Sequence, residues 1–207
     1  MSNFQYLFKV LIVGDTGVGK SSLMMRFTEN KFLENYICTV SLDIRASYVE
    51  LLEGKMMLEV WDTTGDERLK SAMPSFYRGA HGVLLVYDIT SSKSFENIGG
   101  WLKEIMRMCP DKLNVVLVGN KCDDLDHRQV DPEQALQYAR RRGFHSDEVS
   151  AKSGENVYNL FRSLTFDMHD RIVRHGRFED IRELPDEPTN PADTDRQVTT
   201  DDPNTCC

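Results

Sequence analysis

The stretch that decides the fold is Phe8–Ser21, FKVLIVGDTGVGKS. Its first part, Phe8–Val13, is a largely apolar run, which suits a strand of a parallel sheet that is covered on both faces. The part that follows, Gly14–Ser21, matches GxxxxGK[ST] at every fixed position and opens a helical pattern over Lys20–Thr28. A strand, a glycine-rich loop and a helix in this order predict a phosphate-binding loop. An ordinary glycine-rich turn would leave the complete motif unexplained.

The residue types in this loop suit the chemistry of a nucleotide phosphate. Glycines let the backbone approach the phosphates without a Cβ clash, and successive N–H groups at the helix start face the anion. Lys20 is expected on the β- and γ-phosphates, and the Ser21 hydroxyl on Mg²⁺. The expected phosphate-binding residues are Gly14, Asp15, Thr16, Gly17, Val18, Gly19, Lys20, Ser21 and Ser22. This motif alone does not separate GTPases from ATPases and nucleoside kinases.

A carboxylate follows a second apolar run. Asp62 comes directly after Leu58–Trp61, and Gly65 follows three residues later. A carboxylate at a strand end suits Mg²⁺ coordination, and the glycine suits a backbone donor to the γ-phosphate. Asp62 taken alone is also compatible with a helix N-cap before Glu67 and Arg68, but the phosphate loop upstream favours the metal role.

Two polar stretches follow further strand-like runs, Asn120-Lys121-Cys122-Asp123 and Ser150-Ala151-Lys152. Asp123 can accept hydrogen bonds from the N1–H and the exocyclic amine of guanine, a pair of donors that adenine lacks. Asn120 is expected to join this loop to the phosphate loop, and Lys121 to cover the base. A backbone amide of the second stretch is expected to meet the guanine carbonyl. Each stretch alone is also typical of a polar surface loop, but open α/β sheets bind ligands at strand ends such as these.

Strand and helix patterns alternate along the chain. Strands are expected over Phe8–Val13, Leu42–Leu52, Lys55–Trp61, Gly82–Tyr87, Val115–Val118 and Phe144–Val149, and helices over Lys20–Thr28, Ser92–Met108, Asp131–Arg142 and Val157–Val173. This alternation predicts a three-layer α/β domain. Asp131-Pro132 suits a helix start and Gly143 a helix stop.

The composition changes after residue 176. The chain of 207 residues has a net charge of −8, and residues 177–207 hold nine acidic residues against three arginines, with four prolines. Such a segment has too little apolar surface to offset the entropy of ordering, so we expect residues 1–176 to form one domain and 177–207 a disordered acidic tail. An acidic chain is a poor candidate for nucleic-acid binding.

The cysteines and the chain start favour an intracellular protein. Cys38, Cys109 and Cys122 are scattered singly, and Cys206-Cys207 ends the sequence. Five cysteines without framework spacing or metal-ligand spacing indicate a reducing cytosol. The N-terminal residues lack the pattern of a secretory signal, and no stretch approaches 18 apolar residues.

In this order and spacing, GDTGVGKS, WDTTGDE, GNKCD and SAK resemble the nucleotide-binding motifs of Ras-superfamily GTPases. The segments LFKVLIVGDTGVGKSSLMMRF and SFYRGAHGVLLVYDIT and the terminal Cys-Cys resemble the Rab family in particular, and the resemblance covers about residues 6–175 and the last two. It implies a P-loop NTPase fold, with a six-stranded mostly parallel sheet, one antiparallel edge strand and five helices. It further implies that Thr39 closes on Mg²⁺ and the γ-phosphate, and that segments 36–44 and 65–79 are switches ordered around GTP.

The same resemblance implies a slow GTPase that cycles between GTP and GDP and regulates vesicle-mediated transport. The implied partners are an exchange factor, an activating protein, a GDP-dissociation inhibitor, a prenylation escort and effectors, with no nucleic acid, and the protein is expected to be a monomer. Cys206 and Cys207 would carry two geranylgeranyl groups, since one lipid chain gives only marginal anchoring. The protein would then lie on the cytoplasmic face of intracellular membranes, with a soluble pool. The alternative is two incidental cysteines on a disordered end.

The chain departs from the family where DTAGQE is usual, because Asp66 stands at the glutamine position that orients the attacking water. An ionised aspartate only accepts hydrogen bonds, whereas glutamine also donates. We therefore expect slow intrinsic hydrolysis, with Asp66, Lys20 and Thr39 as the catalytic residues. The alternative is a GTP-loaded scaffold or regulator decoy that does not hydrolyse GTP. A P-loop kinase would leave the guanine-reading NKCD unexplained. Thr64, Ser41 and Ile44 also differ from the usual family residues and affect the expected switches.

Overall fold

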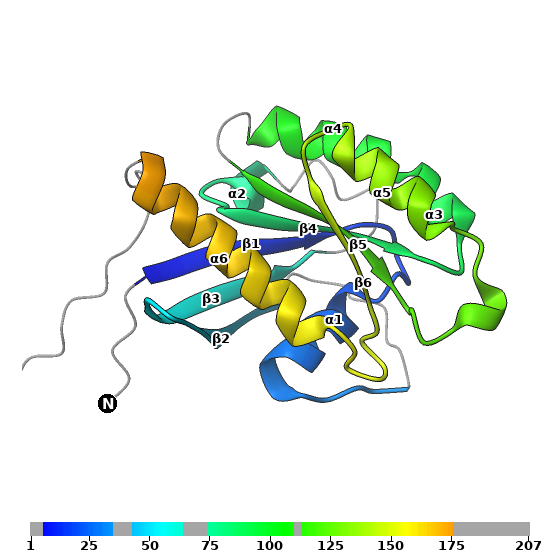
Figure 1. The fold of residues 1–207 in the computed structure, drawn as a ribbon, viewed down its shortest axis with the longest axis horizontal. Coiled ribbons are helices and arrows are strands. Elements are labelled where there is room, and N and C mark those ends of the chain that lie inside the picture. Colours follow the sequence, from blue (N-terminus) through cyan, green and yellow to red (C-terminus); the bar gives the residue numbers. More distant parts are fainter. Residues whose placement is uncertain (1–5, 35–42, 64–73, 110–112, 176–207) are drawn as a thin grey trace, which may run out of the picture.

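The computed structural model describes residues 6–34, 43–63, 74–109 and 113–175. Six strands form one sheet in the order β2-β3-β1-β4-β5-β6 (Figure 1). Their bounds are β1 Tyr6–Val13, β2 Asp43–Leu51, β3 Gly54–Asp62, β4 Gly82–Asp88, β5 Asn114–Asn120 and β6 His145–Val149. The edge strand β2 pairs with β3 in antiparallel register, and all other neighbours are parallel. The expected sheet, including its one antiparallel edge strand, is confirmed.

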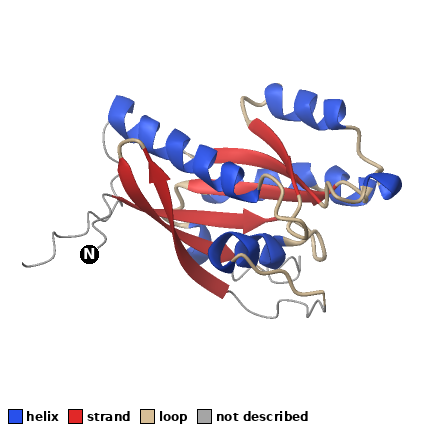
Figure 2. Cartoon of the chain, turned by 60° about the horizontal axis from the view of Figure 1, so that its bottom comes forward, coloured by secondary structure: helices blue, strands red, loops and turns tan. Residues whose placement is uncertain are grey.

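Helices cover both faces of the sheet, which gives the three expected layers (Figures 1 and 2). Their bounds are α1 Lys20–Glu29, α2 Pro74–Tyr77, α3 Ser92–Glu96, α4 Ile98–Met108, α5 Pro132–Arg140 and α6 Val157–His175, with a 3₁₀ turn at Leu125–His127. Helices α1 and α6 pack on one face, and α2, α3, α4 and α5 on the other.

Side chains of β1 alternate between the two faces of the sheet and so contribute to the hydrophobic core on each face. Phe8, Val10 and Ile12 point into the core under α1 and α6, whereas Leu11 and Val13 point into the core under α4 and α5. All five side chains are fully buried. A continuous apolar run is what a central strand covered on both faces requires. The strand therefore reaches the phosphate loop from the middle of the sheet.

The described residues form six α-helical segments, where five helices were expected. The helix expected over 92–108 is divided at Asn97 into α3 and α4, and the short α2 precedes β4. Gly99 and Gly100 follow the break, and glycine has a low helix propensity. By contrast, the expected start at Asp131 is confirmed, because its side chain accepts a hydrogen bond from the Glu133 amide at 3.0 Å.

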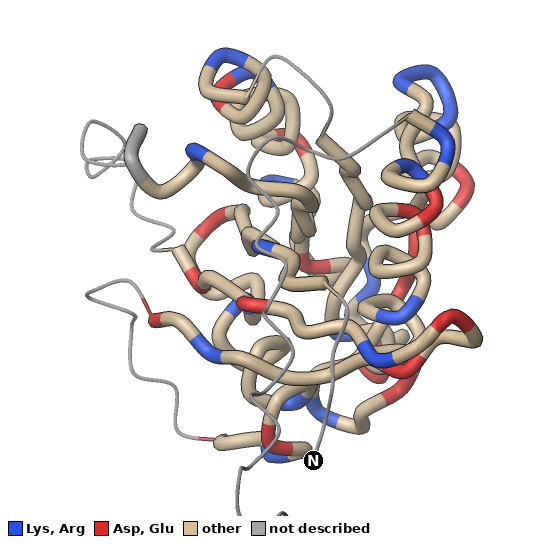
Figure 3. The backbone as a smooth tube through the Cα atoms, turned by 90° about the vertical axis from the view of Figure 1, so that its left-hand side faces the viewer, with Lys and Arg blue, Asp and Glu red and all other residues tan. Residues whose placement is uncertain are grey.

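Charged residues are distributed over both helical layers. Figure 3 shows acidic and basic positions interspersed along the helices. Within the described ranges, no helix is both long enough and apolar enough to cross a bilayer.

Candidate nucleotide-binding site

The candidate site lies at the carboxyl ends of the parallel strands. The loops that follow β1, β3, β5 and β6 leave the sheet at one edge, because these strands run in the same direction. In open α/β sheets this edge is where ligands bind. The described parts of the motifs singled out in the sequence therefore come together in space, although they span residues 14 to 152.

The phosphate loop is a cradle that only glycine can form at two positions. A Cβ at Gly14 would lie 2.2 Å from the Val86 carbonyl oxygen, and one at Gly19 would lie 2.2 Å from Asn120 Nδ2. The φ angle of Gly19 is 95°, in the left-handed region that other residues rarely adopt. Any side chain at Gly14 or Gly19 would thus displace the backbone of β4 or the side chain at the end of β5. The backbone here fits the close approach of a phosphate.

Lys20 begins α1 and turns back over the cradle. Its ammonium donates hydrogen bonds to the carbonyl oxygens of Gly14, at 2.9 Å, and Asp15, at 2.8 Å. The side chain is buried, with 5% of the residue exposed. These bonds hold a positive charge at the loop, where it can meet an anionic ligand.

Asp15 is held by a neighbouring helix. Its Oδ1 accepts a hydrogen bond from Trp101 Nε1 at 2.6 Å, and its Oδ2 accepts one from Asn97 Nδ2 at 2.7 Å. Asn97 and Trp101 lie at the start of α4. The loop is therefore fastened to the helical layer beside it. Sequence reasoning placed Asp15 in the phosphate loop but missed both partners, because no motif marks them.

Two oxygen ligands of the type that Mg²⁺ prefers meet beside the cradle. The Ser21 hydroxyl donates a hydrogen bond to Asp62 Oδ2, and Asp62 is fully buried at the end of β3. The register that pairs Asp62 with Ile12 brings it level with the end of β1. Thr63 extends this connection, because its hydroxyl donates to the Ile12 carbonyl at 2.8 Å. The pair fits a hydrated Mg²⁺ that also contacts phosphate oxygens.

Asn120 connects three loops. Its Nδ2 donates to the Val18 carbonyl at 2.8 Å, and its Oδ1 accepts from the Ala151 amide at 3.1 Å. The residue is 1% exposed at the end of β5. The expected link between the base loop and the phosphate loop is therefore present, and it extends to the loop after β6.

Asp123 is oriented by that third loop. Ser150 Oγ donates to Asp123 Oδ1 at 2.5 Å and accepts from the Ser153 amide at 2.9 Å. Ser150 is fully buried, whereas Asp123 is exposed. The carboxylate is therefore fixed in direction but open to solvent, so a bound base would itself provide the burial that makes its hydrogen bonds selective.

Lys121 is anchored at the end of the neighbouring strand. Its ammonium lies 2.5 Å from Asp88 Oδ2, while Asp88 Oδ1 accepts hydrogen bonds from the amide and hydroxyl of Thr90. Lys121 has a φ of 70°, an uncommon value for a residue with a side chain. This anchoring holds the aliphatic part of the Lys121 side chain at the rim of a cavity that Asn120 and Asp123 also line.

The base loops enclose a cavity of about 350 Å³, whose lining includes Gly19, Asn120, Lys121, Asp123, Ala151 and Lys152. Phe32, Leu33 and Glu34, which follow α1, also line it. Phe32 gives the cavity an aromatic wall on which a base can stack. Sequence reasoning missed these three residues; an aromatic three residues after the end of α1 was the only signal.

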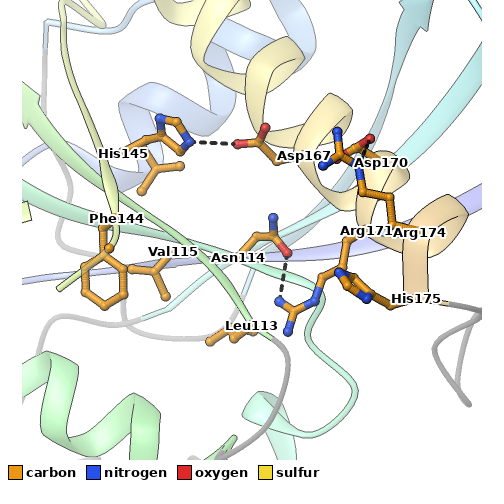
Figure 4. Close-up of a pocket in the computed structure, with 12 residues that line it drawn as sticks. Leu113, Asn114, Val115, Phe144, His145, Asp167, Asp170, Arg171, Arg174 and His175 are labelled. Carbon is orange, nitrogen blue, oxygen red and sulfur yellow. Dashed lines mark hydrogen bonds and ion pairs between the residues drawn. The ribbon is translucent and has the colours of Figure 1, made fainter. Parts of the chain in front are cut away.

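A larger cavity of about 660 Å³ lies at the other end of the sheet (Figure 4). It is lined by the start of β5 and the end of α6, whereas the base pocket lies where β5 ends. His145 lies 3.6 Å from Asp167, and Arg171 donates to Asn114 at 3.2 Å. Burial raises the pKa of the Asp167 carboxyl. None of the expected nucleotide-binding residues lines this cavity.

Some predicted site residues lie outside the described residues. These are Thr39, Gly65, Asp66, Cys206 and Cys207, together with the tail 177–207 and most of both expected switch segments. The three other expected catalytic or metal positions, Lys20, Ser21 and Asp62, lie at the cradle as described above.

Comparison with known proteins gives the family. The model of the Ras family matches residues 9–170. Ras-related protein Rab-13 of Canis lupus familiaris is 46% identical over 165 residues, which cover 80% of this chain and 81% of that protein. Ras-related protein RABD2a of Arabidopsis thaliana is 41% identical over 170 residues, or 82% and 84% of the two chains. GTP-binding protein YPTM1 of Zea mays is 45% identical over 167 residues, or 80% of each chain. Together with the strand order and the converging loops, these matches make the chain a member of the Ras family, a Rab-type small GTPase that binds GTP or GDP with Mg²⁺.

Proposed function

We propose that this small GTPase is a slow switch that recruits effectors to membranes in its GTP state and thereby regulates vesicle-mediated transport. The observation that supports it best is the Ser21–Asp62 hydrogen bond beside the glycine cradle. In this bond Ser21, which would bind Mg²⁺, contacts the Asp62 carboxylate at the end of β3. Thr39 would be the third residue of the magnesium site. The switch would work with an exchange factor, an activating protein, a GDP-dissociation inhibitor, a prenylation escort and effectors.

In this proposal each of the three connected loops binds a different part of the nucleotide. Lys20 and the backbone of Gly14–Ser22 bind the phosphates, and Mg²⁺ neutralises the charge that develops on them. Asp123 accepts from the guanine N1–H and amine, while the backbone of residues 150–152 meets the guanine carbonyl. Asn120 keeps these loops in a fixed relation, as its hydrogen bonds to Val18 and Ala151 suggest.

Asp66 sets the rate of intrinsic hydrolysis in this proposal. A carboxylate can accept a proton or hydrogen bond from water, but when ionised it cannot donate to the transition state. It is also one methylene shorter than glutamine and adds negative charge near the γ-phosphate. We expect it to cost about 1–3 kcal/mol of transition-state stabilisation, which makes the step roughly fivefold to 150-fold slower.

Single-turnover GTP hydrolysis by the purified protein with Mg²⁺ tests this assignment. Asp66→Gln should accelerate hydrolysis, whereas Asp66→Asn restores a donor and removes the charge without restoring the length. Equal rates in all three proteins would remove the role assigned to Asp66. A natural protein that retains GTP without turnover, with recovery in Asp66→Gln, would instead favour the second candidate, a GTP-loaded scaffold or regulator decoy.

We further propose that the protein attaches to membranes through its C-terminal tail. Residues 1–176 would form the nucleotide-binding domain, and residues 177–207 an acidic tail that ends in the lipid-bearing Cys206 and Cys207. The tail lacks the cluster of basic residues that would attract anionic lipids, so anchoring would depend on the two lipid chains. A prenylation assay should show lipid incorporation that is lost in a Cys206/Cys207 double-serine variant. Incorporation that persists in this variant would refute the assignment.

A further inference from the structure

We infer that Arg26 is a positioning residue for the guanine base, because it fastens the loop after β6 to the helix that begins at the phosphates. This inference rests on the proposed nucleotide-binding function and adds a determinant of nucleotide retention. Arg26 lies in the last turn of α1, outside every motif that marks the site.

The guanidinium of Arg26 contacts the loop after β6 through two nitrogens. Its Nε donates to the Ala151 carbonyl at 2.9 Å, and its Nη2 donates to the Lys152 carbonyl at 2.7 Å. The remaining nitrogen, Nη1, donates to the backbone and side-chain oxygens of Asn30 at 3.1 and 3.0 Å. Arg26 therefore ties the end of α1 and two successive carbonyls of the loop together. A planar fork with several donors suits this task, and a lysine could not reproduce it.

The loop after β6 is held from two sides. Asn120 accepts a hydrogen bond from the Ala151 amide, and Arg26 donates to the Ala151 and Lys152 carbonyls. Since each peptide group is planar, these contacts fix three successive peptide planes over residues 150–153. The turn also closes on itself, because the Gly154 amide donates to the Ser150 carbonyl at 2.8 Å.

Gly154 fits the same interpretation. Its φ is 88°, and a Cβ built on it would lie 3.5 Å from Arg26 Cδ. The arginine side chain thus lies against the far end of the turn as well as its centre. Contact along the whole turn restricts the direction in which the 150–152 backbone faces the cavity that these residues line.

The position of Arg26 on α1 connects the base to the phosphates. Lys20 and Ser21 begin the same helix, about 9 Å and about 7.5 Å along the axis from Arg26 at about 1.5 Å per residue. A rigid helix therefore sets the distance between the phosphate cradle and the loop after β6. Because Ser150 holds Asp123, the arginine also supports the carboxylate that reads guanine.

Dissociation of a fluorescent GDP analogue from the full-length protein with Mg²⁺ tests the inference. Arg26→Gln should release the nucleotide about tenfold faster, as expected when charged hydrogen bonds to carbonyls are lost. Arg26→Lys should lie between this variant and the natural protein. The matched control is Arg107→Gln, on the exposed face of α4, where the arginine pairs only with Glu104 among the contacts seen in the described residues. This control should release GDP at the natural rate.

A second readout separates positioning of the base from general damage. Removal of Mg²⁺ with EDTA should accelerate release by the same factor in Arg26→Gln as in the natural protein, because Ser21 and Asp62 are untouched. A release rate within twofold of the natural one would overturn the inference, and so would loss of the EDTA effect. If Arg26→Gln fails to fold, Arg26→Lys must show the faster release. A natural protein that does not retain GDP would contradict the proposed function itself.

Discussion

Trp101 Nε1 donates a hydrogen bond to Asp15 Oδ1 at 2.6 Å, across 86 residues of sequence. The bond fastens the phosphate loop to the first turns of α4, and Asn97 holds the other carboxylate oxygen. The indole is almost fully buried, so this polar group has little access to water. Such a bond is costly to leave unmade.

Replacement of Trp101 by Phe keeps an aromatic ring and removes the donor. We expect the free energy of unfolding to fall by about 1–3 kcal/mol, from the lost hydrogen bond and the smaller ring together. Chemical denaturation measures this change. The double variant with Asp15→Ala should lose less than the sum of the two single changes, because the residues share one interaction. Additive losses would show that the bond contributes nothing.

Replacement of Asp123 by Asn should exchange the preferred base. The amide offers a donor where the carboxylate accepts, so it suits the carbonyl of xanthine and not the amine of guanine. We expect GDP affinity to fall by roughly 10³-fold or more, with xanthosine diphosphate binding better than to the natural protein. Displacement of a fluorescent nucleotide measures both. Asp126→Asn is the matched control, since Asp126 is exposed and does not line the cavity. Unchanged preference for GDP in Asp123→Asn would contradict the role of this carboxylate.

Cys122 lies within the base loop and should be a slow nucleophile at neutral pH. Burial raises its pKa to about 11, helped by the nearby carboxylates of Glu155, Glu148 and Asp123. Only the thiolate reacts, and an ordinary cysteine has a pKa of about 8.5. Alkylation followed by peptide mapping should therefore be slow at neutral pH and rise with pH toward 11. Glu155→Gln removes one of these negative charges and should speed the reaction. Labelling of the natural protein as fast as a free cysteine would disprove this.

Asp167 should make stability depend on pH at the cavity of Figure 4. Burial raises its pKa, and Asp170 and Asp147 add to the shift, while His145 opposes it. A carboxyl with a raised folded-state pKa favours folding when protonated, and this contribution is lost as the pH rises through that pKa. Asp167→Asn should therefore raise the melting temperature near neutral pH and have less effect in acid. A loss of stability near neutral pH would show that the ionised Asp167 is favourable.

The sequence predicted the parts of the site that depend on local pattern. The apolar run at Phe8–Val13 and the glycines after it identify β1 and the cradle, because a buried strand and a close backbone approach each restrict the residue types. Asp62 and Asn120 were found for a similar reason, since each ends an apolar strand. These residues also predicted correctly that the candidate site lies at the carboxyl ends of the parallel strands.

The supporting contacts could not be predicted in this way. Arg26 belongs to a helix pattern in which an arginine is typical of a solvated face, and Asn97 and Trp101 approach Asp15 only after the chain has folded. Phe32 has no motif around it. The hydrogen bond from the buried Ser150 to the exposed Asp123 carboxylate likewise forms only when the loops after β5 and β6 meet.

The central claim is that the connected loops bind guanine nucleotides selectively and with Mg²⁺. Competition between GDP and ADP for displacement of a fluorescent GDP analogue, with and without EDTA, measures it directly. We expect GDP to displace the analogue at concentrations roughly 10⁴-fold lower than ADP, and EDTA to accelerate release. Equal displacement by GDP and ADP, or release indifferent to Mg²⁺, would contradict the account.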